Sequence, residues 1–108
     1  MRGVLFISFE PKEQELIQRA SAQLCLLPRS PLLTESKAAL ITEVRKKDWS
    51  LPQSSVDLEA LRSLLELLLI QLPEIILDLE HRKKIHHLIE DAICLVNTAT
   101  GQIYANIL

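Results

Sequence analysis

The run of leucine and isoleucine from Leu58 to Leu79 constrains the fold more than any other feature of the sequence. A transmembrane helix needs roughly 20 apolar residues with few charges. Charged side chains nevertheless recur through this run, at Glu59, Arg62, Glu66, Glu74 and Asp78. Pro73 also interrupts it. The run therefore predicts a pair of deeply buried helices, and we expect no membrane partner.

Apolar residues recur at helical spacing in four segments, which predicts helices over residues 11–26, 32–47, 55–72 and 74–91. Pro11 suits the first turn of the first helix. Thr34 is an alternative N-cap for the second helix. Ser54, with Asp57 three residues later, resembles a capping box at the start of the third. Pro73 favours the start of a new helix, so we expect the third helix to end before it.

Both ends of the chain show strand patterns. Residues 4–9, VLFISF, are rich in β-branched and aromatic side chains. Near the other end, Asn97–Gly101 is typical of a turn, and apolar and polar residues alternate over 102–107. The predicted fold is α+β and mostly α, with about four helices and a small antiparallel sheet formed by the N-terminal strand and a C-terminal hairpin. We expect residues 1–108 to form a single domain.

Residues 92–106, AICLVNTATGQIYAN, resemble the opening hairpin of PAS sensor domains. In that hairpin a strand, a polar turn ending in glycine, a second strand and an asparagine recur. The resemblance covers about fifteen residues of the chain. It implies a strand–turn–strand structure there, and we carry over neither a ligand nor a function from it.

The net charge indicates which partners the chain suits, and the cysteines indicate its cellular compartment. Twelve Lys and Arg against fourteen Asp and Glu give a net charge of −2, so the chain as a whole has no bias toward polyanions. Cys25 and Cys94 lie far apart among apolar neighbours, which predicts buried free thiols. The apolar run near the N-terminus is shorter than that of a secretion signal. We therefore expect a cytoplasmic protein.

Leucine and isoleucine make up nearly a third of the chain, and a domain of this size cannot hide so many aliphatic side chains. Some of them are expected to cover an interface with a protein partner or a second copy. The candidate interface residues are Leu65, Leu68, Leu69, Ile76 and Trp49, although a lone tryptophan more often packs onto its own core. The favoured hypothesis is a small non-catalytic interaction or regulatory protein that acts through an apolar helical surface, as a homodimer or a complex subunit.

The first alternative is a small DNA- or RNA-binding regulator that uses the basic segment 81–87 and the hairpin predicted after it. Phosphate contacts need positive charge on one face. Two basic runs could supply it: Arg82, Lys83 and Lys84, and Arg45, Lys46 and Lys47. Acidic residues flank both runs and aromatic residues for base stacking are scarce, which counts against this alternative.

The second alternative is a metal-binding protein or an enzyme. Its candidate ligands are His81, His86, His87 and Glu90. His86 and Glu90 are four residues apart and share a helix face, but one helix cannot encircle a metal ion with these groups. The sequence has no nucleophile elbow, P-loop or dinucleotide fingerprint. We expect no cofactor, and the sequence leans against an enzyme.

Overall fold

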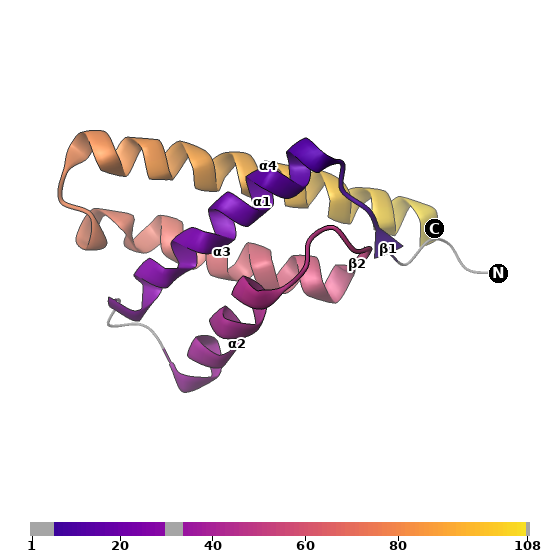
Figure 1. Cartoon of the computed structure of the whole chain (residues 1–108), viewed down its shortest axis with the longest axis horizontal. Helices are drawn as coiled ribbons and strands as arrows, with labels where there is room; N and C mark the ends of the chain where they lie inside the picture. The colour runs from indigo at the N-terminus through magenta and orange to yellow at the C-terminus, as the bar shows by residue number, and fades with distance from the viewer. Residues whose placement is uncertain (1–5, 30–33, 108) are drawn as a thin grey trace.

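The structure is a computed structural model that describes residues 6–29 and 34–107, and it is mostly helical (Figure 1). The elements follow the order β1 (Phe6–Ile7), α1 (Pro11–Ala22), the 3-10 helix η1 (Gln23–Arg29), α2 (Glu35–Lys46), β2 (Gln53–Ser54), α3 (Ser55–Ile75) and α4 (Leu79–Ile107). None of the described helices is long and apolar enough to cross a membrane.

Helices α3 and α4 form a long hairpin that carries most of the core (Figure 1). On α3 the buried stripe consists of Leu58, Leu61, Leu65, Leu68 and Leu72. On α4 it consists of Ile85, Ile89, Ala92, Val96, Ala99 and Ile103. Steps of three and four residues keep each stripe on one face of its helix. The two stripes belong to one continuous core.

Helix α1 runs across the α3–α4 hairpin, and α2 packs against α3 (Figure 1). α1 and η1 bury Ile17, Ala20, Leu24 and Leu27. The only tryptophan, Trp49, is 4% exposed and belongs to the same core. These elements therefore cover one side of the hairpin.

Local signals placed the starts of α1 and α3 correctly, and the alternative N-cap of the second helix marks the start of α2. The fourth helix was expected to start at residue 74, but α4 begins at Leu79. Pro11 is the first residue of α1, and Thr34 is the N-cap of α2, accepting a hydrogen bond from the Lys37 amide. Residues 32 and 33 of the expected second helix lie outside the described residues. The capping box is confirmed: the Ser54 hydroxyl accepts from the Asp57 amide at 3.3 Å, and the Asp57 carboxylate accepts from the Ser54 amide at 3.1 Å.

The small antiparallel sheet is confirmed, but its second strand was expected in the wrong place. β1 pairs with β2, with Phe6 opposite Ser54 and Ile7 opposite Gln53. The partner strand therefore lies in mid-chain, directly before α3. Residues 4 and 5 of the expected N-terminal strand lie outside the described residues.

The predicted C-terminal hairpin is wrong, and with it the resemblance of residues 92–106 to a PAS hairpin. α4 continues as a helix through Asn97–Gly101 and on to Ile107. The physical reason is the buried stripe, which continues at helical spacing through Val96, Ala99 and Ile103. Packing of this stripe outweighs the low helix propensity of asparagine, threonine and glycine.

The expected break at Pro73 is also wrong. α3 continues through Pro73 to Ile75, and α4 begins at Leu79 after the link 76–78. A proline so close to the end of a helix removes one hydrogen bond, the one that would reach the Leu69 carbonyl. Few residues remain beyond it to be disturbed, so the helix tolerates it.

The exposure of the two thiols also differs from the prediction. Cys25 and Cys94 are free, as predicted, but both are exposed. Their apolar neighbours in sequence turn toward the core, whereas the cysteines lie on the outer faces of η1 and α4.

Replacing Gly101 with alanine is expected to raise the free energy of unfolding by about 0.5–1 kcal/mol, the usual difference between the two residues inside a helix. Gly101 lies inside α4, has no positive φ, and a Cβ built on it meets nothing within 4 Å. Urea unfolding measures the change. In a hairpin turn that needs glycine the same substitution would destabilise the protein, so a loss of stability would contradict the helix.

Tyr104 gives a second test of the C-terminal helix. Its hydroxyl donates a hydrogen bond to Glu59 Oε1 at 2.8 Å, and this bond raises the pKa of Tyr104 above its ordinary value. We expect Glu59→Gln to lower that pKa, because the carboxylate charge near the phenol is lost. Tyr104 is the only tyrosine, so the absorbance of tyrosinate reports it alone. Glu66→Gln, on the same helix, is the control and is expected to leave the titration unchanged.

Candidate functional site

One side of the α3–α4 seam faces solvent, and exposed polar side chains pair across it. Tyr104 reaches Glu59, and Arg62 Nη1 donates to Asn97 Oδ1 at 3.1 Å. Along α3, Arg62 also lies 3.7 Å from Glu66. These pairs occupy the part of the seam farther from the α3–α4 turn.

Near that turn the seam opens into a groove of about 290 Å³. Three apolar residues of α3 and three nitrogen-bearing residues of α4 line it: Leu69, Leu72, Pro73, Arg82, Lys83 and His86. The apolar side chains come from one helix and the basic ones from the other. The groove is therefore amphipathic, with an apolar wall and a positively charged rim.

Pro73 gives this groove a polar feature as well. It has no N–H, so the Leu69 carbonyl has no helical donor four residues later. Leu69 and Pro73 both line the groove. The usual helical hydrogen bond to the Leu69 carbonyl is therefore missing beside the groove.

The three rim residues have different roles. Arg82 Nη1 donates to the carbonyl of Ile76, the C-cap of α3, at 3.4 Å, where positive charge offsets the helix dipole. His86 lies 3.0 Å from Glu90. Lys83 is exposed. Among the described residues, no carboxylate lies within ion-pair distance of Arg82 or Lys83, so the rim keeps positive charge that the chain does not neutralise.

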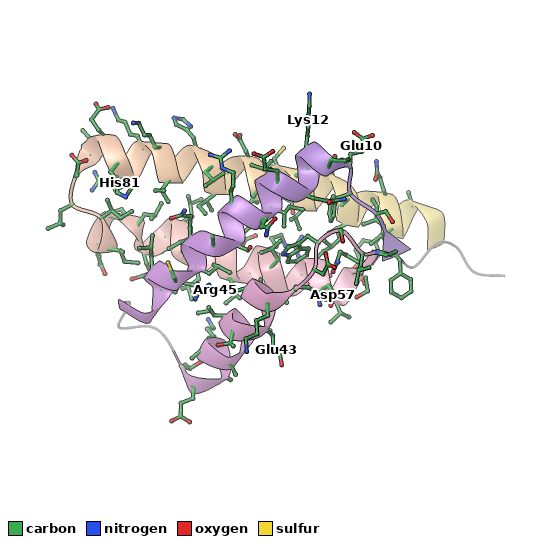
Figure 2. The ribbon with its side chains drawn as sticks, in the orientation of Figure 1. Glu10, Lys12, Glu43, Arg45, Asp57 and His81 are labelled. Atoms are coloured by element: carbon green, nitrogen blue, oxygen red, sulfur yellow. The ribbon has the colours of Figure 1, made fainter. Side chains whose placement is uncertain are left out.

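The turn beside the groove is unusually apolar for an exposed segment. Leu77, in the link between the helices, is 84% exposed, and Leu79, the first residue of α4, is 50% exposed. Ile70, one residue after Leu69 on α3, is 70% exposed. Single exposed leucines are normal, but several at one end of the molecule near an apolar groove make that end a candidate site. We define the tip surface as these three side chains together with the groove. Figure 2 shows the first turn of α4 at this end, with His81 labelled.

A second group of exposed apolar side chains lies at the other end of the molecule, around the sheet. It consists of Phe6, Leu51, Val56 and Tyr104. The small pocket that contains Val56 is only about 110 Å³ and has Lys47 and Asp57 in its wall, which pair at 2.9 Å. This end therefore lacks the uncompensated positive rim that accompanies the tip surface.

The predicted interface residues lie mainly inside the chain's own core. Leu65 and Leu68 are fully buried in the α3–α4 seam, and Ile76 is 7% exposed. Trp49 packs onto the core of its own chain, so its assignment as an interface anchor is corrected. Only Leu69 reaches the groove. A partner surface therefore has to use other apolar residues.

The side chains that sequence reasoning missed are Ile70, Pro73, Leu77 and Leu79. The usable signal was the alternation of leucine and acidic residues over 77–80, LDLE, which does not continue the helical stripe. Leu77 lies in the link and Leu79 at the first position of α4, and neither belongs to a buried stripe.

The two basic runs do not form one surface. Lys84 is exposed but does not line the groove with Arg82 and Lys83. Arg45 and Lys46 lie in the last turn of α2, away from the first turn of α4 (Figure 2). The two runs therefore lie on different helices, and their use in phosphate contacts stays a prediction.

Lys47, the third residue of its run, is already paired with Asp57. Burial acts to raise the pKa of Asp57, but hydrogen bonds from Lys47 and Ser54 outweigh it. The pKa of Asp57 therefore lies below its ordinary value. The carboxylate is charged at neutral pH, and Lys47 is its ion-pair partner.

The predicted metal ligands are spread over the start of α4. His86 pairs with Glu90, and its ring lies edge-on to that of His87 with centroids 6.2 Å apart. His81 lies in the first turn, where its amide donates to the Asp78 carboxylate. Within residues 6–29 and 34–107, no three His, Cys, Asp or Glu side chains gather in a set that could hold a metal ion.

The groove and the exposed leucines beside it are thus the strongest candidate site. Their chemistry suits an apolar segment that carries carboxylates: leucine-sized side chains against the wall, and negative charge against the rim. The chain matches no protein-family model, no curated protein and no solved structure.

Proposed function

We propose that this chain is a small non-catalytic interaction protein that binds a partner protein through the tip surface. The observation that carries the proposal is Leu77, which is 84% exposed beside an apolar groove with a positive rim. Covering one leucine side chain contributes about 1.5–3 kcal/mol to an association. A partner that covers Leu77, Leu79 and Ile70 together therefore gains a substantial apolar contact.

The size of the groove supports a protein segment as its occupant. At about 290 Å³ it lies at the small end of ligand sites, which span about 300–1,000 Å³. It is large enough for a few side chains of a partner. The rim, with Arg82 and Lys83, favours a segment with Asp or Glu beside its apolar residues, because opposite charges steer and orient association.

The proposal includes a reducing compartment, the cytoplasm. Cys25 and Cys94 are both free and both exposed. Disulfides form and persist in oxidising compartments, and exposed thiols there are open to oxidation. Two accessible thiols therefore fit a protein that works where thiols stay reduced.

Photo-crosslinking tests the partner surface. Benzoylphenylalanine is placed at position 77 and, as the matched control, at position 56. Val56 is 73% exposed, also apolar, and lies at the opposite end of α3. We expect irradiation in cells to give a discrete adduct from position 77 that is absent from position 56, with mass spectrometry identifying its second component. No adduct from position 77, or the same adducts from both positions, would contradict the proposal.

A further inference from the structure

We propose that the partner is a second copy of this chain, and that the turn segment 74–80 of each copy docks in the groove of the other. This inference rests on the proposed function, because it names the partner of the same surface. It adds a specific geometry: two α3–α4 hairpins that meet at their turns, related by a two-fold axis.

Charge complementarity is the first argument. The turn segment reads EIILDLE and presents exposed Leu77 and Leu79 between the exposed carboxylates of Glu74 and Glu80. The groove presents an apolar wall beside positive side chains. The segment therefore has the apolar and acidic chemistry that the groove requires.

Charged side chains without an ion-pair partner also favour this docking. Among the described residues, neither Glu74 nor Glu80 lies within ion-pair distance of a basic group, and Lys83 lies within that distance of no carboxylate. Asp78 differs, because it caps the His81 amide at 3.1 Å. Charges of both signs are thus left unpaired within one short stretch of chain, and a second copy pairs them.

Placement is the third argument. The segment forms the α3–α4 turn (Figure 1) and stands in the sequence between the groove residues Pro73 and Arg82. In a two-fold dimer the same patch serves on both subunits, so a contact of residue i with residue j occurs twice. Docking one segment in the partner's groove therefore places the partner's segment at the first groove, and both Leu77 side chains are covered.

The geometry also sets the shape of the dimer. One protomer measures 50 × 29 × 22 Å, with its longest dimension along the hairpin. Two protomers that meet at their turns form a particle much longer than one protomer. A dimer that packs side by side along the helices keeps nearly the length of one protomer, so small-angle scattering distinguishes the two arrangements.

Charge-swapped variants test the docking directly. Lys83→Glu reverses the groove, and the double variant Glu74→Lys/Glu80→Lys reverses the segment. Arg82 and Asp78 are left intact because they hold the turn. By sedimentation velocity we expect an elongated wild-type dimer, and dissociation constants raised at least about tenfold (1.4 kcal/mol) for each variant alone. An equimolar mixture is expected to restore the dimer, since both grooves then face segments of opposite charge.

The controls keep the result interpretable. Lys84→Glu makes the same charge change one residue away, outside the groove, and is expected to remain dimeric. Circular dichroism melts check that every variant folds, and Leu77→Ser, at an exposed position, is expected to lose the dimer while keeping its fold.

A wild-type chain that is monomeric at every concentration would overturn the second copy as partner. Crosslinking from position 77 to a different protein would then still uphold the proposed function. A dimer that persists in both reversed variants, with no preference for the mixture, would place the interface elsewhere and would equally overturn the inference.

Discussion

The Leu65→Ala variant is expected to lose about 2–5 kcal/mol of unfolding free energy, the range for truncating a fully buried leucine. Leu65 has no exposed surface and lies in the middle of the α3–α4 seam, packed within the continuous core. Removing three carbons there leaves a cavity that two long helices cannot easily close. Urea unfolding followed by the fluorescence of Trp49, the only tryptophan, measures the loss.

Leu77→Ala is the matched control for that experiment. Its side chain is 84% exposed, so in the monomer we expect a change within about 0.5 kcal/mol, as for most surface substitutions. The comparison separates two sets of leucines: those that hold the chain together and those available to a partner. Equal losses for the two variants would contradict the assignment of Leu65 to the core and of Leu77 to the surface.

The Ala99→Pro variant is expected to lose about 3 kcal/mol or more, because proline inside a helix removes a hydrogen bond and clashes with the preceding turn. Ala99 lies inside α4, is 2% exposed and belongs to the continuous core. The substitution therefore disturbs both the helix and its packing in the core. Thermal unfolding and the helical signal in circular dichroism measure the effect.

Glu80→Pro is the control, because Glu80 lies in the first turn of α4. The first backbone hydrogen bond of this helix is donated by the Arg82 amide, so the Glu80 amide is not needed for it. Proline is tolerated at such positions, so we expect little change in the stability and helicity of the monomer. In a turn over 97–101, by contrast, Ala99→Pro would be accepted. If Ala99→Pro keeps the helicity and stability of the wild type, residues 97–101 form a turn and not a helix.

The starts of α1 and α3 were predictable because their signals are local. The Ser54–Asp57 capping box satisfies backbone groups within one turn, and Pro11 suits a first turn whatever the rest of the chain does. The buried stripe of α3 was equally visible as a repeat of leucines. These features need no knowledge of distant parts of the chain.

The C-terminal half of α4 could not be predicted in the same way, because tertiary packing overrides its local preferences. Asn97–Gly101 is rich in residues that favour turns, and the helix forms there because its buried side chains pack into the core. The helical step from Val96 to Ala99 and on to Ile103 was the available signal. The alternation of apolar and polar residues after Gly101 favoured a strand instead, so this helical spacing was overlooked.

Only the basic half of the candidate site was predicted from the sequence. Arg82 and Lys83 were identified as candidate binding residues, but the apolar wall beside them depends on Pro73 staying inside α3. The number of leucines in the sequence also does not show which of them are buried in the core and which are exposed. α3 packs against α4, α1, α2 and η1, so it uses most of its leucines internally and leaves the turn to face solvent.

Amide spectra of the isotope-labelled chain, recorded from low to high micromolar concentration, test most directly the claim that the tip surface is where two copies meet. We expect the signals of residues 69–86 to shift or broaden as concentration rises, while those of residues 51–56 at the opposite end stay in place. Spectra that do not change, or changes centred on 51–56, would contradict this interface.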